Sequence, residues 1–369
     1  MRENAATVPV DHVDTRPIPS TLPAGNHGQP NNFDALRLAA ALLVLVSHQF
    51  FFLGRPQPAP TGDSLGAVAV MVFFVISGYL VAESWYRDPH VMRFALRRVL
   101  RLWPALVVAT VAIALACVAI TTLPMHDYFG RATRRFIVGN IQLRTFYELP
   151  GVFVTQPDNP SLSAVNGSWW TIPVEAKCYV YLAILGAIGL RRRWLSVVAL
   201  GLVVLMYIKT LQGHSQADAF NNISFFYIAF FMTGVCARQF VDALRHSRIA
   251  IICAAGAIAC VVAAMVFGQP RLAEWAVIAP LTLIVGSLST PVMRSAGRFG
   301  DLSYGIYLYA YFAQQLTMRF WPGTPALGSS LIVAAAMTTF MAWCSWHAVE
   351  APALRLKRHL RRWFPDRAA

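Results

Sequence analysis

The sequence predicts an all-α integral membrane protein, a polytopic bundle of about ten transmembrane helices with both termini in the cytoplasm. Three observations support this prediction. Hydrophobic residues make up 57% of the chain and charged residues only 13%, whereas soluble domains are about 25% charged. The apolar residues are collected into stretches of membrane-spanning length. Lys and Arg are collected on alternate connections between these stretches.

The apolar stretches come first, because they define the predicted helices. A run of about 18 or more apolar residues can cross the hydrocarbon core of a bilayer as an α-helix. Short polar breaks, such as the three arginines at 191–193, separate one run from the next. The predicted spans are 34–53, 64–86, 99–122, 170–189, 193–209, 222–241, 248–268, 271–290, 302–320 and 328–349.

The basic residues set the predicted orientation. With a cytoplasmic N-terminus, 22 of the 31 Lys and Arg fall on inner segments and 8 on outer ones, with Lys177 inside a span. Cytoplasmic loops carry such an excess of positive charge. It also accounts for most of the net charge of +14, so we expect a lipid bilayer as partner and no nucleic acid. We expect the protein to lie in the cell's inner, cytoplasmic membrane.

The regions outside the spans are short. Residues 1–32 are polar, contain five prolines and lack an apolar signal-peptide core, which predicts a disordered cytoplasmic tail. The transmembrane domain is predicted over 33–352, followed by a basic cytoplasmic tail over 353–369. The amphipathic stretch 134–153 is too polar to span easily. It could lie on the interface, re-enter the membrane or form an eleventh span.

The six cysteines all lie within apolar segments, without a CxxC motif or a neighbouring histidine cluster. We therefore interpret them as small core residues and predict no metal site.

The first span carries ionisable residues at both ends of an apolar run, RLAAALLVLVSH. Arg37 and His48 are eleven residues apart, about 20° past three full turns, so they share one helix face about 16 Å apart along the axis. Ionisable side chains within a membrane are costly and usually face a partner or a cavity. The alternative for His48 is a neutral imidazole that a neighbouring helix satisfies.

The fourth span begins with SWWTIPVE and places Glu175 inside the membrane. Counted from the outer end, Glu175 lies at about the same depth as His48. A carboxylate at that level could orient the imidazole. The alternative is an ion pair with Lys177 or an arginine, although positions two apart face away from each other on a helix. The adjacent Trp169 and Trp170 are typical of an interfacial aromatic belt.

The third span begins with RRVLRLWP, in which Arg98 and Arg101 are three residues apart on one face. Two such guanidinium groups can bind phosphates in a bidentate way. The alternative is ordinary flanking charge at a cytoplasmic helix end.

Together these fragments resemble the acyltransferase-3 family of membrane O-acyltransferases. The resemblance covers roughly residues 32–358 and includes the R-x10-H arrangement of Arg37 and His48. It continues through FFVISGYL (73–80), RRVLRLWP, GSWWTIPVE, LSYGIYL and HAVEAPALRLKR, in that order. One departure is Ala310, where the family often has a histidine.

The resemblance implies transfer of an acyl group, commonly acetyl, from acyl-CoA to a hydroxyl of a carbohydrate. On this hypothesis Arg37, Arg98 and Arg101 bind the phosphate-rich donor. His48 acts as general base or relays the acyl group, and Glu175 orients it. Acyl-CoA is then a substrate, and no cofactor is bound. The partners are acyl-CoA and a carbohydrate or glycoconjugate acceptor.

A polytopic secondary transporter is the main alternative, because it too would place ionisable groups within the membrane. The sequence shows no duplicated halves and no paired broken helices, which argues against a transporter.

Overall fold

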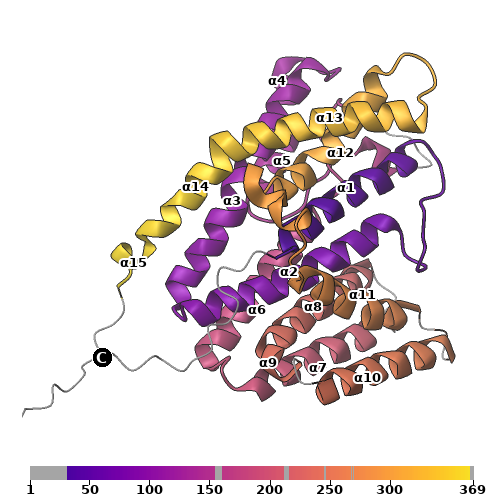
Figure 1. Ribbon diagram of the computed structural model, residues 1–369. Helices are drawn as coiled ribbons and strands as arrows, with labels where there is room; N and C mark the ends of the chain where they lie inside the picture. The colour runs from indigo at the N-terminus through magenta and orange to yellow at the C-terminus, as the bar shows by residue number, and fades with distance from the viewer. Residues whose placement is uncertain are drawn as a thin grey trace, which may run out of the picture. The chain divides into compact units, whose positions relative to one another are not determined.

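The computed structural model describes residues 31–153, 160–211, 216–244, 247–266, 268 and 270–365. All regular secondary structure in these ranges is helical (Figure 1). The α-helices are α1 (Phe33–Phe52), α2 (Leu65–Arg87), α3 (Val91–Ala116), α4 (Met125–Tyr128), α5 (Arg131–Ile141), α6 (Thr171–Ile188), α7 (Arg193–Thr210), α8 (Gln216–Gln239), α9 (Val241–Leu244), α10 (Ser247–Val266), α11 (Pro270–Ser287), α12 (Ser303–Phe320), α13 (Leu327–Ser345), α14 (Ala351–Arg355) and α15 (Leu360–Trp363).

A helix covers each of the ten predicted spans, and seven helical segments within the described residues are long and apolar enough to cross a membrane. These seven contain α1, α2, α3, α6, α7, α8 and α13. The helices over the other three predicted spans are α10, α11 and α12. Of these, α12 carries several tyrosines and glutamines, and nearly all of its residues are buried. Such a helix packs within the protein and needs little apolar surface toward lipid.

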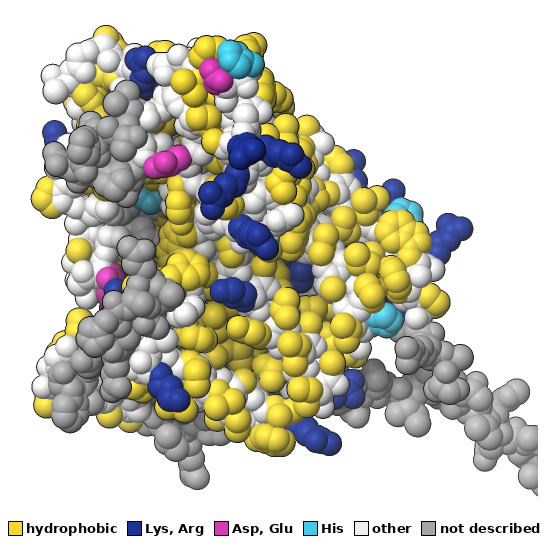
Figure 2. Space-filling model, turned by 180° about the vertical axis from the view of Figure 1, so that it is seen from behind, with side chains coloured by type: hydrophobic (Ala, Val, Ile, Leu, Met, Phe, Trp, Pro, Cys, Tyr) yellow, Lys and Arg dark blue, Asp and Glu magenta, His cyan; other side chains and the backbone are white. Residues whose placement is uncertain are grey.

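The outer surface is apolar, as expected for a polytopic helical membrane protein. Large hydrophobic side chains on α11 and α13 point outward; Ile284, Ile332 and Phe340 are each more than 60% exposed. Figure 2 shows hydrophobic side chains over much of one face, among scattered Lys and Arg and few acidic groups. Large exposed apolar areas of this kind are typical of a surface that contacts a membrane or another protein.

Helix α2 lies within the bundle and packs against α1, α6, α8 and α11. Two glycines allow α2 and α8 to approach closely. A Cβ on Gly78 would lie 1.9 Å from the carbonyl oxygen of Phe231, and one on Gly234 would lie 2.2 Å from that of Val75. Small residues at such crossings let membrane helices pack backbone to backbone. The FFVISGYL fragment therefore has a packing role at Gly78.

The stretch 134–153 does not span the bilayer. Its helical part belongs to α5, which has 11 residues and is therefore about 16 Å long, too short to cross. Helix α5 packs against α3, and the Trp103 indole donates to the carbonyl of Ile141 at 3.1 Å.

The two predicted tails differ in what the structure describes. Residues 1–30 lie outside the described residues. Asn32, at the predicted tail boundary, is buried, and its side chain donates to the carbonyl of Val285 and accepts from Thr290. At the other end, α14 and α15 lie beyond α13 (Figure 1) and pack on α3. Arg93 donates to the carbonyl of Phe364 at 2.7 Å.

The segment before α6 runs through the protein interior and is tied to α12. Asn166 and the Trp169 indole both donate to the carbonyl of Leu308, at 2.7 and 3.1 Å. Gln315 donates to the carbonyls of Leu162 and Ala164. Trp169 therefore faces the protein interior, because the residue is only 2% exposed and its N–H is satisfied there. Trp170 is half-buried, and an interfacial position stays a prediction for it.

Candidate active site

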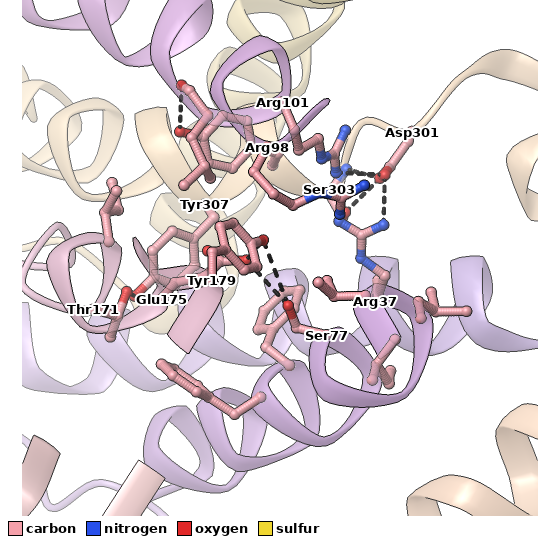
Figure 3. Close-up of a pocket in the computed structure, with 18 of the residues that line it drawn as sticks. Arg37, Ser77, Arg98, Arg101, Thr171, Glu175, Tyr179, Asp301, Ser303 and Tyr307 are labelled. Atoms are coloured by element: carbon pink, nitrogen blue, oxygen red, sulfur yellow. Dashed lines mark hydrogen bonds and ion pairs between the residues drawn. The ribbon is translucent and has the colours of Figure 1, made fainter. Parts of the chain in front are cut away.

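Two cavities hold the ionisable residues that the sequence singled out. The first, the arginine cavity, has a volume of about 320 Å³. It lies among α1, α2, α3, α6, α12 and the C-terminal helices (Figure 3). The second, the histidine cavity, has a volume of about 510 Å³. The charged and polar residues that line the first are Arg37, Ser77, Arg98, Arg101, Thr171, Glu175, Tyr179, Asp301, Ser303, Tyr304, Tyr307 and Lys357.

Asp301 joins two of the three predicted arginines. Its Oδ2 lies 2.8 Å from Arg37 and 2.6 Å from Arg101, and its Oδ1 accepts from the backbone N–H of Ser303 at 3.2 Å. Burial alone would raise the pKa of Asp301, but the charges of Arg101 and Arg37 outweigh it and hold the pKa well below its usual range. The carboxylate is therefore ionised at neutral pH and fixes both guanidinium groups at the cavity wall.

Arg98 lines the same wall with a different set of contacts. Its Nη2 donates to the Ser84 hydroxyl at 3.4 Å, and its buried Nε has no hydrogen-bond partner among the described residues. The guanidinium carbon lies 5.8 Å from the centre of the Phe94 ring and 5.7 Å from that of Tyr179. Arg98 is thus held by aromatic faces, and its donors remain available to an anionic ligand.

Glu175 lies in the arginine cavity and bonds to neutral hydroxyls. Its Oε1 accepts from the Tyr179 hydroxyl and, at 3.3 Å, from that of Ser77 (Figure 3). Because the Tyr179 ring also lies against Arg98, Glu175 positions the aromatic face on which this arginine rests. Lys177 faces away, over the ring of Phe220 at 5.6 Å.

His48 lies in the histidine cavity, with Phe51, Gln57, Tyr147, Glu148, Ala164, Gly167 and Tyr311. Its ring meets the edge of Tyr311, with centroids 5.3 Å apart and planes at 80°. Its buried Nδ1 has no hydrogen-bond partner among the described residues. Packing on Tyr311 therefore orients the imidazole, and its other edge, with Nε2, is the one that can face the cavity.

The structure brings four of the five predicted site residues to one cavity and places His48 in another. Arg37, Arg98, Arg101 and Glu175 line the arginine cavity. The expected pairing of Glu175 with His48 is not formed. The reason is the buried segment before α6. Val165 and Asn166 are fully buried, so α6 begins inside the protein, and a count from the end of a predicted span does not specify which side chains Glu175 meets.

The two cavities are neighbours along the same elements. On α12, Tyr307 lines the arginine cavity and Tyr311 the histidine cavity, one turn or about 6 Å apart along the axis. Between the cavities, the Tyr307 hydroxyl bonds to the Ser168 carbonyl at 2.8 Å and to the Thr171 hydroxyl at 2.7 Å. We call this group, Ser168, Thr171 and Tyr307, the partition.

This arrangement can be compared with known proteins. The profile of the acyltransferase-3 family, described as an acyltransferase domain, matches residues 31–349. The chain belongs to the acyltransferase-3 family. The match covers every helix from α1 to α13. It includes all residues that line the two cavities except Leu354 and Lys357 of the arginine cavity.

Two relatives of this acyltransferase match along almost their whole length. An O-acetyl transferase of Shigella phage Sf6 is 28% identical over 340 residues, covering 87% of this chain and 95% of the relative. Nodulation protein 10 of Rhizobium leguminosarum bv. viciae is 29% identical over 376 residues, covering 92% of this chain and 97% of the relative. No solved structure matches the chain.

In this acyltransferase the arginine cavity offers a cationic surface beside an apolar one. Arg37, Arg98, Arg101 and Lys357 face it, against the two carboxylates Glu175 and Asp301, and Phe73, Phe74 and Leu80 are among its apolar residues. Guanidinium groups next to apolar surface suit a ligand with phosphates at one end and an uncharged arm at the other.

The sequence did not single out several residues of these cavities. Asp301 stands directly before the LSYGIYL fragment, and Ser77 lies within FFVISGYL, so the motifs pointed to the positions of both. Tyr179 follows Glu175 by four residues, a spacing that places the two on one helix face. Gln57 and Glu148 lie in connecting segments, where helical spacing carries no signal.

Proposed function

We propose that this protein is an O-acyltransferase that moves an acyl group, acetyl in the first instance, from acyl-CoA to a hydroxyl of a cell-surface or exported carbohydrate. The observation that carries the proposal is the arginine cavity, in which Arg98 has no carboxylate contact among the described residues while Asp301 already engages Arg37 and Arg101. The O-acetyl transferase name of the phage relative supports acetyl as the group transferred.

The donor would bind with its phosphates on the guanidinium groups. Arg98 supplies free donors, and Arg37 and Arg101 add positive potential from fixed positions beside it. Lys357, on the segment after α14, extends this cationic wall. The apolar residues of α2 would take the uncharged arm, which points the thioester toward the partition.

The transfer step would use His48. Its imidazole takes the proton of the acceptor hydroxyl as the oxygen attacks the thioester carbonyl carbon. The C–S bond then breaks, and the proton passes to the departing thiolate, so that an ester and free CoA thiol are formed. Because the partition lies between the cavities, the step requires Tyr307 or Thr171 to move and admit the thioester.

We also propose a membrane topology, because acyl-CoA must reach the arginine cavity from the cytoplasm. Acyl-CoA is cytoplasmic, so the Arg37 end of α1 faces the cytoplasm and the His48 end lies toward the outer side. We propose that α10, α11 and α12 also cross, which gives ten spans with both termini in the cytoplasm of an inner-membrane protein. The excess of basic residues on the inner segments supports this orientation.

The first test is binding of labelled acetyl-CoA to the purified protein in lipid nanodiscs. We expect saturable binding that Arg98→Ala weakens by about 10- to 100-fold, which corresponds to losing a charge-assisted hydrogen bond of about 1.5–3 kcal/mol. Arg98→Lys should recover part of it. The matched control is Arg361→Ala, an exposed arginine on α15.

No binding to folded wild-type protein would contradict the proposal and favour a transporter. Equal binding by Arg98→Ala would remove this residue from the donor site.

The second test separates binding from chemistry. Replacing His48 by Ala should abolish acetyl transfer while leaving acetyl-CoA affinity unchanged, because His48 lines the other cavity. Glu175→Gln should instead weaken donor binding, because it loosens Tyr179 beneath Arg98. Transfer retained by His48→Ala would exclude it as the base.

A further inference from the structure

The histidine cavity has a chemistry unlike that of the arginine cavity. Its volume of about 510 Å³ lies within the range of small-molecule sites, about 300–1,000 Å³. The described residues that line it include no Lys or Arg and one carboxylate, Glu148. Three aromatic side chains, Phe51, Tyr147 and Tyr311, complete the wall around His48.

Two polar side chains in this cavity are each held by a buried serine. The Ser47 hydroxyl donates to Oε1 of Gln57 at 2.6 Å, and Ser47 is fully buried. The Ser163 hydroxyl donates to Oε1 of Glu148 at 2.7 Å. Each serine engages one oxygen. The amide NH2 of Gln57 is then left as a hydrogen-bond donor, and the second carboxylate oxygen of Glu148 is left as an acceptor.

The segment that carries Tyr147 and Glu148 is fixed from both sides. Asn140 on α5 donates to the carbonyl of Phe146 and accepts from its N–H, at 3.0 and 3.1 Å. Val165 donates to the carbonyl of Tyr147 at 2.6 Å. Although Glu148 is exposed, its backbone is therefore held in place, as a specificity site requires.

We propose that the histidine cavity is the acceptor site and that it takes an uncharged, hydroxyl-rich sugar, which Glu148 and Gln57 position against His48. A fixed donor and a fixed carboxylate match adjacent sugar hydroxyls, and the aromatic rings match the apolar face of a sugar ring. The same carboxylate, with no cation among the described lining residues, repels an acidic sugar. This inference rests on the proposed transfer to a carbohydrate and names the class of sugar.

The test compares two tetrasaccharides that differ in charge, one of galactose and one of galacturonic acid. Saturation-transfer NMR on the protein in nanodiscs measures their binding without requiring turnover. We expect wild type to bind the galactose tetramer at least about tenfold more tightly than the galacturonate. Glu148→Lys should shift this ratio by tenfold or more toward the acidic sugar, and Glu148→Gln should shift it less. The matched control is Asp127→Asn, an exposed acid on α4, which should leave the ratio unchanged.

The outcomes distinguish this inference from the function on which it rests. Equal or tighter binding of the galacturonate by wild type, no binding of either sugar, or an unchanged ratio in Glu148→Lys would overturn it. Acetyl-CoA binding is measured on the same samples. If acetyl-CoA binds and neither sugar does, the acceptor site is wrong and the donor site stands. If the galactose tetramer binds and acetyl-CoA does not, the sugar site stands and the proposed transfer fails.

Discussion

At the scale of single residues, the arginine cavity holds its buried guanidinium groups in two opposite ways. Asp301 satisfies Arg37 and Arg101 together, whereas Arg98 rests on aromatic rings and its Nε has no partner among the described residues. A buried donor without a partner costs free energy. A donor left without a partner at a cavity wall is consistent with a bound ligand that accepts its hydrogen bond, so Arg98 is the first residue to test.

Gly167 is the residue on which the placement of Tyr311 depends. A Cβ there would lie 2.6 Å from the Tyr311 ring, so Gly167→Ala should displace the ring that orients His48. We expect acetyl transfer to fall on the order of tenfold to a hundredfold, because a misplaced reacting group loses alignment. Acetyl-CoA affinity should stay unchanged, since the donor cavity lies beyond the partition.

Both quantities can be measured on one preparation. The control is Gly328→Ala on α13, where an added Cβ meets nothing within 4 Å. Wild-type transfer by Gly167→Ala would show that the Tyr311 contact does not position His48.

At the scale of elements, the fold depends on close helix crossings and on charged turns. The crossing of α2 and α8 is set by backbone contacts at Gly78 and Gly234. Because Ser77 and the apolar residues of α2 line the arginine cavity, this crossing also fixes one wall of the donor site.

Gly78→Ala should therefore destabilise the protein strongly. The added Cβ would meet the carbonyl of Phe231 at 1.9 Å, a backbone atom that cannot rotate away. We expect a loss of about 3 kcal/mol, the upper end for overpacking a core, measured by SDS titration of the purified protein. Gly201→Ala on α7 is the control, since nothing lies within 4 Å of its added Cβ. Equal stability of the two variants would contradict the close crossing.

The turn between α2 and α3 carries a buried charge cluster. Asp88 accepts from Arg93 at 3.0 Å and also from Arg97, and Arg93 in turn donates to Phe364 beyond α15. Burial would raise the pKa of Asp88, but the hydrogen bonds from the two arginines lower it below its usual value. The cluster thereby links this turn to the end of the C-terminal helices.

The pH dependence of this cluster follows from the lowered pKa. A carboxyl with a depressed pKa in the folded state stabilises fully above its unfolded pKa of about 3.9, and the stabilisation is lost as the pH falls through the folded value. Wild type should thus lose this contribution only below about pH 4. Asp88→Asn should be less stable than wild type at pH 7, and the difference should shrink at lower pH. Thermal unfolding of both proteins from pH 3 to 7 measures it, and a constant difference would contradict the assignment.

At the scale of the whole molecule, the proposed chemistry needs access from two sides. The Arg37 end of α1 and the His48 end belong to different cavities, and the proposed donor and acceptor approach from opposite faces of the membrane. Cysteines at exposed positions report these faces, because the five native cysteines whose side-chain burial the structure describes are buried or half-buried.

We expect a membrane-impermeant thiol reagent applied to intact cells to label Asp127→Cys and not Arg361→Cys. In inverted vesicles the labelling should be reversed. Both sites are exposed, one on α4 and one on α15. Labelling of both from the same side would contradict the topology, and with it the cytoplasmic position of the arginine cavity.

Spacing along one helix predicts which residues share a face of that helix, but it does not predict which residues of two different helices meet. Arg98 and Arg101 were expected on one face of a cytoplasmic helix end, and both line one cavity. The pairing of His48 with Glu175 was expected from equal depth alone. Depth along two helices does not specify their lateral separation, and α6 begins inside the protein after the largely buried segment 164–171.

By itself, the sequence determined that the chain is helical and apolar outside, where its helices lie and which ionisable residues fall within its apolar stretches. These properties follow from hydropathy and from the period of a single helix. Only the tertiary structure decided that Asp301 pairs with Arg37 and Arg101, that Glu175 lines the arginine cavity and that Gln57 and Glu148 line the same cavity as His48. Those contacts join segments far apart in the sequence, such as Ser77 and Glu175, or involve residues in connecting segments. These contacts depend on how the helices are rotated and tilted and on the path of the loops, and local sequence spacing does not specify these quantities.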